Sequence, residues 1–381
     1  MSGAIAPDIS VSVNNVYDPD SGGFSANDVL DMTAIPFVYA RWTNPTVRML
    51  EKRMAALEGG ETALATASGM AAAAVVFLGS LRAGDHLVVS DVCYPGVREL
   101  ASQLLPDLGI SVTAVDLSQP ELLRAAMRPE TRLVHAETPC NPLLRLTDLH
   151  AVAAIAHEGG ALLSVDSTLV TPVSTRPLEL GADLVIHSLT KYVNGHGDAM
   201  GGIVVGAADL VEPLRAKWGV RLGATLDPRA AALILRGSDT LVARLEALSR
   251  NAQIVANKLE EHKAIQRVIF PGSPSHPQYE LAKSQMSLPG AVIAFSTAEP
   301  MQDARRLYSS MKIVRYAVSL GHQHSNLCLL KTEDLVASTY RLNSAAEADY
   351  RTWAGSGLFR LSVGLEEPGD VFNDILDSLD A

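Results

Sequence analysis

Short apolar runs alternate with helical patterns between residues 86 and 205, and this alternation is the feature that most constrains the fold. The predicted strands are His86–Ser90, Ser111–Val115, Arg132–Ala136, Ala161–Val165, Leu184–Ile186 and Gly202–Val205. The predicted helices between them are Glu99–Leu105, Glu121–Met127 and Leu149–His157. Strands that are apolar almost throughout, and that alternate with helices, are typical of a parallel sheet buried on both faces. The sequence therefore predicts an α/β fold with a mostly parallel sheet flanked by helices.

The segments before this alternation predict an N-terminal arm followed by two helices. Residues 1–45 are rich in turn-forming residues, and they are expected to form an arm that contacts a neighbouring subunit, with a disordered segment as the equally good alternative from composition alone. A helix is expected after Asn44-Pro45, capped by Thr46 and stopped at Gly59-Gly60. Ser68-Gly69-Met70 leads into a second helix that ends near Leu81.

The last third of the chain predicts a smaller α+β domain. One long helical pattern runs from about residue 230 to residue 262. It is followed by predicted strands at Arg267–Ile269, Ala291–Phe295 and Leu358–Val363 and by predicted helices at Met301–Met311 and Val371–Leu379. We therefore divide the chain into an arm (1–45), a larger domain (46–245) and a C-terminal domain (246–381).

Composition excludes several classes of protein. The 381 residues carry a formal net charge of −11, which argues against a nucleic-acid binder and against docking on anionic lipid. The three cysteines form no CxxC pair, so neither a disulfide framework nor a structural metal is expected. No apolar run approaches the roughly 18 residues of a membrane helix, and the N-terminus lacks a secretory signal. A cytoplasmic location is expected.

A lysine follows one of the predicted strands at the edge where parallel sheets bind ligands. Ligands of such sheets sit at the carboxyl ends of the strands, where Glu137, Asn141, Asp166 and the segment Ser188–Lys191 are expected to lie. Lys191 can act as a catalytic amine if burial or nearby cations lower its pKa. A surface lysine is an equally good interpretation of this segment alone.

Further residues suit an anionic, aromatic ligand, although each has an ordinary structural interpretation. The start of the helix at Ser68-Gly69-Met70 can bind phosphate, with help from the hydroxyls of Ser188 and Thr190 and from Arg41. Asp166 can hold a protonated ring nitrogen or cap a turn, and Tyr94 can stack on a flat cofactor or lie at the edge of the core. Arg360 lies on an apolar strand and needs an anion, which is a substrate carboxylate or an internal partner.

Several motifs together resemble one family. They are Tyr39-Ala40-Arg41, Leu57-Glu58-Gly59-Gly60, Ala67-Ser68-Gly69-Met70, Glu137-Thr138-Pro139-Cys140-Asn141-Pro142, Val165-Asp166, His187-Ser188-Leu189-Thr190-Lys191-Tyr192, Gly195-His196-Gly197-Asp198, Ser275-His276-Pro277 and Arg360-Leu361-Ser362-Val363-Gly364. The chain is similar, from about residue 36 to 375, to the cystathionine synthase/lyase family of pyridoxal-phosphate (PLP) enzymes, which includes methionine gamma-lyase. The resemblance implies the aminotransferase-like fold known as fold type I.

The resemblance also implies roles for individual residues. Lys191 would form the Schiff base with PLP and act, with Tyr94, in proton transfer. The other cofactor-binding residues would be Asp166 at the ring nitrogen, Tyr94 on the ring, Ser68, Gly69, Met70, Ser188 and Thr190 at the phosphate, and Tyr39 and Arg41 at the phosphate of a neighbouring subunit. The substrate would be held by Arg360, Asn141, Ser319 and His324. The family resemblance further implies a homotetramer built as a dimer of dimers.

Three departures from the family pattern concern the substrate more than the cofactor. Asp166-Ser167-Thr168 stands where Asp-Asn-Thr is common, and Tyr94-Pro95-Gly96-Val97 lacks the reactive cysteine of methionine gamma-lyases. After Ser319-Leu320-Gly321, an acidic residue of the family is replaced within His322-Gln323-His324. On a strand, His322 and His324 would share one face. No third metal ligand is evident beside them, so they are expected to tune the substrate.

The expected reaction is α,γ-elimination from an amino acid of the methionine, homocysteine or cystathionine type, or from a more polar homoserine derivative such as canavanine. Alternatives are γ-replacement, as in cystathionine gamma-synthases and O-acylhomoserine sulfhydrylases, and cystathionine β-lyase activity. A non-catalytic binding relative is a remote alternative, because Lys191 and Asp166 are both present. Ser188-Leu189-Thr190-Lys191 also matches S-x-x-K, but the S-D-N and K-T-G motifs of serine acylases are absent.

Overall fold

The computed structural model describes residues 7–18, 20 and 37–380, and two sheets organise them. The larger sheet has seven strands in the order β1-β7-β6-β5-β4-β2-β3. Their bounds are β1 Thr62–Thr66, β2 His86–Ser90, β3 Ser111–Val115, β4 Thr131–Glu137, β5 Leu162–Asp166, β6 Leu184–Ser188 and β7 Gly202–Gly206. The run β3-β2-β4-β5-β6 is parallel, and only β7 runs antiparallel to its neighbours β6 and β1. The mostly parallel sheet is thus confirmed.

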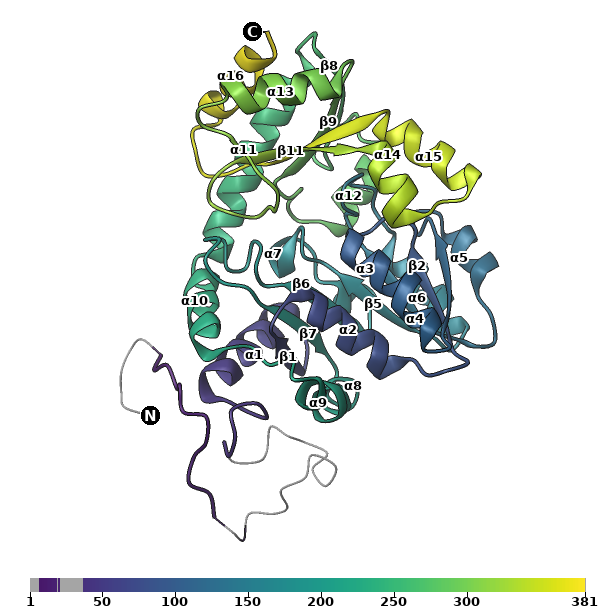
Figure 1. Ribbon diagram of the computed structural model, residues 1–381, viewed down its shortest axis with the longest axis vertical. Coiled ribbons are helices and arrows are strands. Elements are labelled where there is room, and N and C mark those ends of the chain that lie inside the picture. Colours follow the sequence, from purple (N-terminus) through teal and green to yellow (C-terminus); the bar gives the residue numbers. More distant parts are fainter. Residues whose placement is uncertain (1–6, 19, 21–36, 381) are drawn as a thin grey trace.

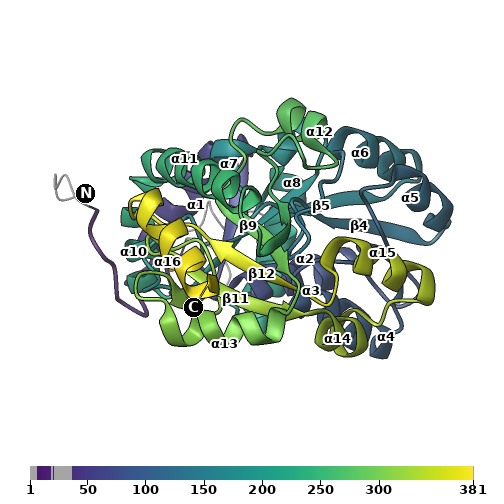
Figure 2. The same cartoon turned by 90° about the horizontal axis from the view of Figure 1, so that it is seen from above.

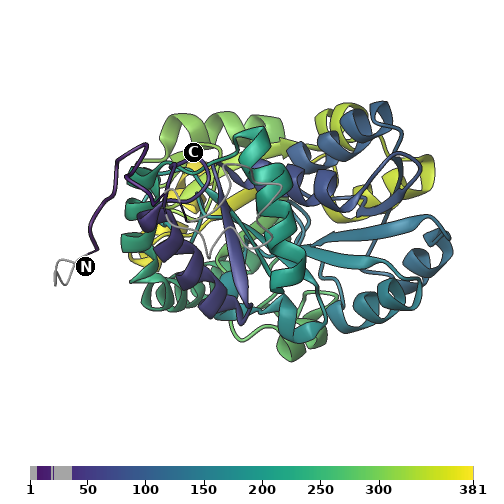
Figure 3. The same ribbon diagram turned by 90° about the horizontal axis from the view of Figure 1, so that it is seen from below.

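Helices cover both faces of this sheet. Their bounds are α1 Pro45–Glu58, α2 Gly69–Ser80, α3 Pro95–Glu99, α4 Leu105–Asp107, α5 Pro120–Ala126, α6 Leu149–Glu158, α7 Thr171–Ser174, α8 Ala208–Leu214 and α9 Val220–Leu222. The cluster built around Val76 and Phe77 of α2 fills one face, and the cluster built around Val152 and Ile155 of α6 fills the other. Seen from below, the blue and teal strands lie between these two layers (Figure 3).

The first helix is capped by a different residue than the sequence predicts. The Oδ1 atom of Asn44 accepts from the backbone N–H groups of Thr46 (2.9 Å) and Val47 (3.2 Å), which makes Asn44 the N-cap. The hydroxyl of Thr46 instead binds the arm, because it accepts from Ser10 N at 2.9 Å and donates to Asp8 O at 3.1 Å. Gly59 ends the helix as predicted, with a left-handed φ of 76°.

The long helical pattern after residue 228 is two helices rather than one. They are α10 Pro228–Ser238 and α11 Leu241–Glu260, and Asp239 and Thr240 separate them. Arg244 of α11 explains the break, since its guanidinium turns back to donate to Gly237 O at 2.7 Å. The predicted domain boundary at residue 245 lies inside α11, which runs from the larger sheet toward the second one (Figure 1).

The second sheet has five strands in the order β10-β11-β12-β9-β8. Their bounds are β8 Ile265–Ile269, β9 Val292–Thr297, β10 Arg315–Tyr316, β11 Asn326–Lys331 and β12 Gly357–Ser362. The helices around it are α12 Tyr279–Gln285, α13 Pro300–Ser310, α14 Thr332–Asp334, α15 Ser344–Ala354 and α16 Pro368–Asp380. Figure 2 shows α11, α13 and α16 gathered around β11 and β12. The smaller α+β unit is confirmed, and β10 and β11 are additions to the predicted strands.

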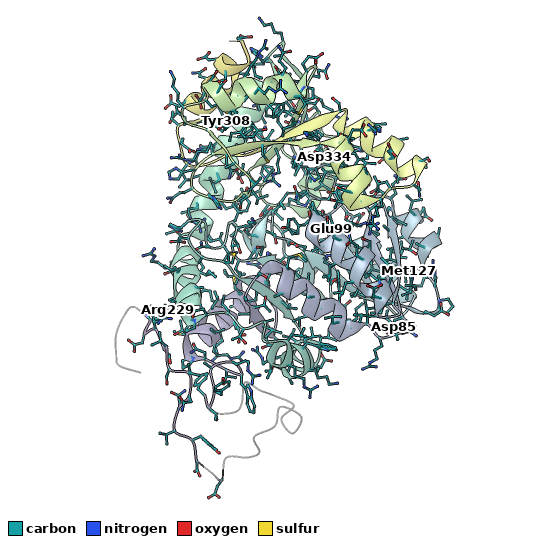
Figure 4. All side chains as sticks on the ribbon, viewed as in Figure 1. Asp85, Glu99, Met127, Arg229, Tyr308 and Asp334 are labelled. Carbon is teal, nitrogen blue, oxygen red and sulfur yellow. The ribbon has the colours of Figure 1, made fainter. Side chains whose placement is uncertain are left out.

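The segment from α14 to α15 lies over the larger sheet's own helices. Figure 4 labels Glu99 on α3 and Asp334 in the segment above it. The Oγ1 atom of Thr339 donates to Glu99 Oε1 at 3.1 Å, and Tyr340 O accepts from Arg98 at 3.1 Å. No helix in the described ranges is long and apolar enough to cross a membrane.

Candidate active site

Three polar residues lie at the carboxyl ends of adjacent parallel strands. Glu137 ends β4, Asp166 ends β5 and Ser188 ends β6, and Glu137 pairs with Asp166 in the register of the sheet. Lys191 follows three residues after Ser188, and its backbone N–H donates to Ser188 O at 3.1 Å. The predicted gathering of these residues at one edge is therefore confirmed.

Among the described residues, the amine of Lys191 has one hydrogen-bond partner, which comes from the second sheet's unit. Nζ donates to Ser319 Oγ at 2.7 Å. Burial lowers the pKa of Lys191, and the charge of Arg360 lowers it further. A lowered pKa makes the free amine available as a nucleophile and as a base.

Arg360 of β12 is a buried cation that forms no ion pair with any described residue. Its Nη1 donates to Asn141 Oδ1 at 3.0 Å and its Nη2 to Ser319 O at 3.0 Å. Its Nε atom is buried without a hydrogen-bond acceptor within the described part of the chain. A buried guanidinium with an open donor is suited to an incoming carboxylate.

The backbone of Ser319 is held in a strained conformation by its neighbours. Its φ of 79° is left-handed, which L-residues other than glycine, asparagine and aspartate rarely adopt. Gly321 follows with a φ of 80°, and a Cβ atom there would lie 2.7 Å from Tyr192 N. The loop therefore packs directly on the backbone of the Lys191 segment, and this packing places the Ser319 hydroxyl on the amine.

Glu137, which is buried, and Asp166, which is half-buried, form an acidic pair at the ends of β4 and β5. Burial raises the pKa of Asp166, whose Oδ1 accepts from Thr168 N at 2.9 Å. Burial and the charge of Asp166 raise the pKa of Glu137. Asp166 forms no ion pair among the described residues, so a cationic N–H group brought to it would relieve the cost of its burial.

Glu137 is a site residue to which the sequence analysis gives no role. Its Oε2 accepts from Tyr94 N at 2.6 Å and its Oε1 from Asn141 N at 2.6 Å. One carboxylate thus fixes two backbone segments on opposite sides of the sheet edge. The position at a strand end is visible in the sequence, but the two backbone partners are not.

The N-terminus of α2 forms a cradle for an anion. The Ser68 hydroxyl caps the helix by accepting from Ala71 N at 3.1 Å. A Cβ atom at Gly69 would lie 2.8 Å from Ser188 Cβ, so only glycine allows β6 to approach the helix start this closely. The hydroxyl of Thr190 is engaged with the backbone of Gly201, donating to its oxygen at 3.2 Å and accepting from its nitrogen at 3.1 Å. Thr190 therefore fixes the backbone next to the cradle by binding Gly201.

Tyr94 lies at the rim of this cradle. It is the N-cap residue of α3 and is 47% exposed. A Cβ atom at Gly96 would lie 2.9 Å from both Tyr94 Cε1 and Met70 Sδ, which places the tyrosine ring beside α2. A tyrosine ring with an exposed surface beside the cradle is suited to stacking on a planar ligand.

Two predicted residues lie away from this cluster in the single chain. The guanidinium of Arg41 donates to Val220 O at 2.7 Å and lies 5.4 Å from the ring centroid of Tyr39. This pair packs near α9 (Figure 1). A role at the phosphate of a neighbouring subunit therefore stays a prediction.

The two histidines do not share a face of a strand, so this prediction is wrong. Residues 317–325 form a loop, because the left-handed residues Ser319 and Gly321 prevent an extended strand. The side chain of His324 is 60% exposed, with Nδ1 3.7 Å from Glu366 Oε1. His322 is half-buried and turns inward, with Nε2 3.5 Å from Ser319 Oγ.

Arg244 is a second contributor that the sequence does not mark. Besides Gly237, it donates to Tyr192 O at 2.8 Å and to Val193 O at 3.2 Å. These carbonyls follow Lys191 directly, so α11 holds the loop that carries the amine. Gly195, with a φ of 70°, leaves room for the guanidinium.

The fold and the site define a class of protein. A half-buried lysine amine, a half-buried carboxylate that forms no ion pair with any described residue, and a helix N-terminus for an anion lie together at the carboxyl edge of a mostly parallel sheet. This donor set fits PLP, whose aldehyde, ring nitrogen and phosphate need these three groups. The molecule is thus of the PLP-dependent, fold-type-I class.

Comparisons with known proteins identify the family. The model of the Cys/Met metabolism PLP-dependent enzyme family matches residues 9–380. The chain belongs to this family, so it is an enzyme and its cofactor is PLP.

Relatives and solved structures agree with this assignment. The chain is 42% identical over 348 residues to the L-methionine gamma-lyase of Porphyromonas gingivalis (91% of this chain, 86% of that protein). It is 41% identical over 385 residues to the canavanine gamma-lyase of Rhizobium leguminosarum bv. trifolii (100% of this chain, 92% of that protein). The crystal structure of cystathionine gamma synthase from Xanthomonas oryzae pv. oryzae matches with a TM-score of 0.89 at 35% identity (100% of this chain, 94% of that chain).

Proposed function

We propose that the enzyme cleaves the bond between Cγ and a heteroatom of an L-amino acid, releasing a 2-oxo acid and ammonia. The observation that carries the proposal is the convergence of the Lys191 amine, the Ser319 hydroxyl and the Arg360 guanidinium at one place. Relatives named as γ-lyases of methionine and of canavanine support PLP-dependent γ-elimination. The substrate is therefore methionine, homocysteine or cystathionine, or a more polar homoserine derivative such as canavanine.

Each group of the cofactor has a proposed partner in the chain. Lys191 holds the aldehyde carbon, Asp166 the ring nitrogen and Tyr94 the ring face. The helix start at Gly69 and Met70, capped by Ser68, holds the phosphate together with Ser188, and Thr190 supports the loop. Bound PLP supplies an electron sink for the charge that develops when a proton leaves the substrate's Cα.

The chain's own residues then bind the substrate and move its protons. Arg360, held by Asn141 and by Ser319 O, binds the substrate carboxylate and thereby turns the Cα–H bond toward Lys191. Once the substrate's amino group has displaced it, the free amine of Lys191 removes the Cα proton. After giving that proton up, the amine removes a proton from Cβ, which allows the heteroatom group to leave from Cγ. Ser319 keeps the amine on the substrate side, because it is the hydrogen-bond partner of Nζ.

The quaternary arrangement belongs to the same proposal. We propose a homotetramer in which Tyr39 and Arg41 of one subunit complete the phosphate site of its neighbour. Within the described part of the single chain, Arg41 binds Val220 O of α9 and makes no hydrogen bond to the Lys191 cluster. Molar mass from light scattering tests the assembly directly.

γ-Replacement is the second candidate, favoured by the match to a cystathionine gamma synthase structure. The deciding experiment offers the purified enzyme a panel of methionine, homocysteine, cystathionine, canavanine and O-acylhomoserines, each with and without added thiol. Mass spectrometry then measures 2-oxo acid, ammonia and thioether product. Thioether formation from an O-acylhomoserine, without 2-oxo acid from any compound, would overturn the lyase proposal.

A further inference from the structure

A line of three proton-carrying groups leads from the site amine toward the protein surface. Lys191 Nζ donates to Ser319 Oγ at 2.7 Å, and Ser319 Oγ lies 3.5 Å from His322 Nε2. Ser319 and His322 are both half-buried, and the His322 ring lies on the far side of the Ser319 hydroxyl from the amine.

The backbone holds His322 in this position. Its ring lies against Gly197, where a Cβ atom would be 3.3 Å from the imidazole. The next residue, Gln323, donates its N–H to Gly195 O at 3.0 Å and accepts from Leu365 N at 2.8 Å. The loop 319–323 is thus bound at one end to Lys191 and at the other end to Gly195 of the Lys191 segment and to Leu365 beyond β12.

We propose that His322 is a positioning residue that exchanges protons with the Lys191 amine through the Ser319 hydroxyl. In the outward direction, the Lys191 ammonium gives one proton to Ser319 Oγ while the hydroxyl proton of Ser319 passes to His322 Nε2. Only N–H and O–H bonds form and break, and one positive charge moves from Nζ to the imidazole. The inward direction reverses each transfer. This inference rests on the proposed function, in which Lys191 carries substrate protons.

The charges around His322 favour the acceptor form. Burial lowers the pKa of His322, and the charges of Lys191 and His324 lower it further, which favours the neutral ring that can accept a proton. The other titratable groups of the adjoining segments have separate partners. His196 is hydrogen-bonded to Asn194 O, Asp198 accepts from Asn194 Nδ2, and Glu366 accepts from the Ser325 backbone and hydroxyl.

The test compares His322→Gln with His150→Gln in the holoenzyme. Glutamine places an amide near the position of Nε2 but cannot titrate, and His150 is the matched control because it is exposed on α6 and lies outside the site. The visible absorbance of the bound cofactor is titrated against pH. Exchange of the substrate's Cα hydrogen is followed by NMR in deuterated buffer.

We expect His322→Gln to shift the pH midpoint of the absorbance and to slow Cα exchange about tenfold or more. KM should stay within about twofold, and added imidazole should restore part of the exchange rate. His150→Gln should match the wild type. The proposal is overturned if both variants behave alike, or if His322→Gln raises KM without slowing exchange, since the side chain would then contact substrate only.

The two proposals fail in different ways. Cα exchange requires only proton transfer to and from Lys191, and it needs no leaving group. An enzyme that exchanges the Cα hydrogen but releases no 2-oxo acid would overturn the proposed elimination and leave the His322 comparison intact. Cofactor content and the midpoint of thermal unfolding are measured for each variant, so that an unfolded protein is not counted as a result.

Discussion

At the residue scale, the open donor of Arg360 makes a sharp prediction. Arg360→Lys replaces a planar fork that spans Asn141 and Ser319 with a single ammonium, so it cannot bind a carboxylate by two parallel bonds. We expect KM to rise about tenfold to a hundredfold, which corresponds to about 1.5–3 kcal/mol. Arg351→Lys on the surface helix α15 is the control. An unchanged KM in Arg360→Lys would place the substrate carboxylate elsewhere.

Glu137 provides a second test at the same scale. In Glu137→Gln, one of the two short contacts places an amide N–H against a backbone N–H, which leaves a buried donor unpaired. We expect a loss of about 1–3 kcal/mol in the free energy of unfolding. A fall in kcat/KM should accompany it, because Tyr94 and Asn141 are both held by this carboxylate. Urea unfolding and steady-state kinetics measure the two effects. Loss of activity without loss of stability would show that Glu137 acts on the substrate directly.

The strand-end residues show what sequence can predict about a site. Glu137, Asp166 and Ser188 follow apolar runs, and burial on both faces makes such runs unmistakable, so their meeting at one edge is predictable. The hydrogen-bond partners of Lys191 and Arg360, in contrast, could not be predicted from the sequence. The Ser319 hydroxyl meets the Lys191 amine because the backbone at Ser319 and at Gly321 is left-handed. Such backbone angles do not follow from any period in the sequence. The same two left-handed residues explain why His322 and His324 do not share one face of an extended strand, which is the arrangement that the sequence suggests.

At the scale of elements, α11 supports the Lys191 loop through one side chain. Arg244 is buried and donates to three carbonyls, so Arg244→Met leaves those oxygens without their donor. We expect the free energy of unfolding to fall by about 3 kcal/mol or more. Arg250→Met, an exposed position on the same helix, should change it by less than about 0.5 kcal/mol. Equal effects of the two substitutions would contradict the support role.

Some helix and strand boundaries could not be predicted from the hydrophobic pattern of the sequence. Helices α10 and α11 read as one helix because their apolar spacing continues across Asp239 and Thr240, and the break depends on a contact made by Arg244. Strand β11 follows an irregular loop, and its six residues are too few to show a clear period. Its register with β12, in which Cys328 faces Arg360, is a tertiary property.

At the scale of the whole molecule, buried neutral histidines predict acid sensitivity. Burial lowers the pKa of both His135 and His276 from 6.5 to about 4. Between these values the unfolded chain binds protons that the folded chain does not. Stability should therefore be complete above about pH 6.5 and fall as the pH drops toward about 4.

His276 allows this prediction to be measured. Its Nε2–H donates to Leu144 O and its Nδ1 accepts from Gln278 N, both at 3.1 Å, so the neutral tautomer is fixed. We expect His276→Gln to flatten the slope of unfolding free energy against pH between 4 and 6.5. His150→Gln, at an exposed position, should leave that slope unchanged. The slope is obtained from denaturant unfolding at a series of pH values.

The left-handed backbone of Ser319 has a consequence for laboratory evolution. Glycine would relieve a cost of about 1 kcal/mol at this position, so Ser319→Gly should be enriched in a library sorted for heat resistance. The same change deletes the hydroxyl that meets Lys191, so a library sorted for turnover should lose it. The residue found at position 319 would therefore differ between the two libraries, and it would show whether the conditions select for stability or for activity.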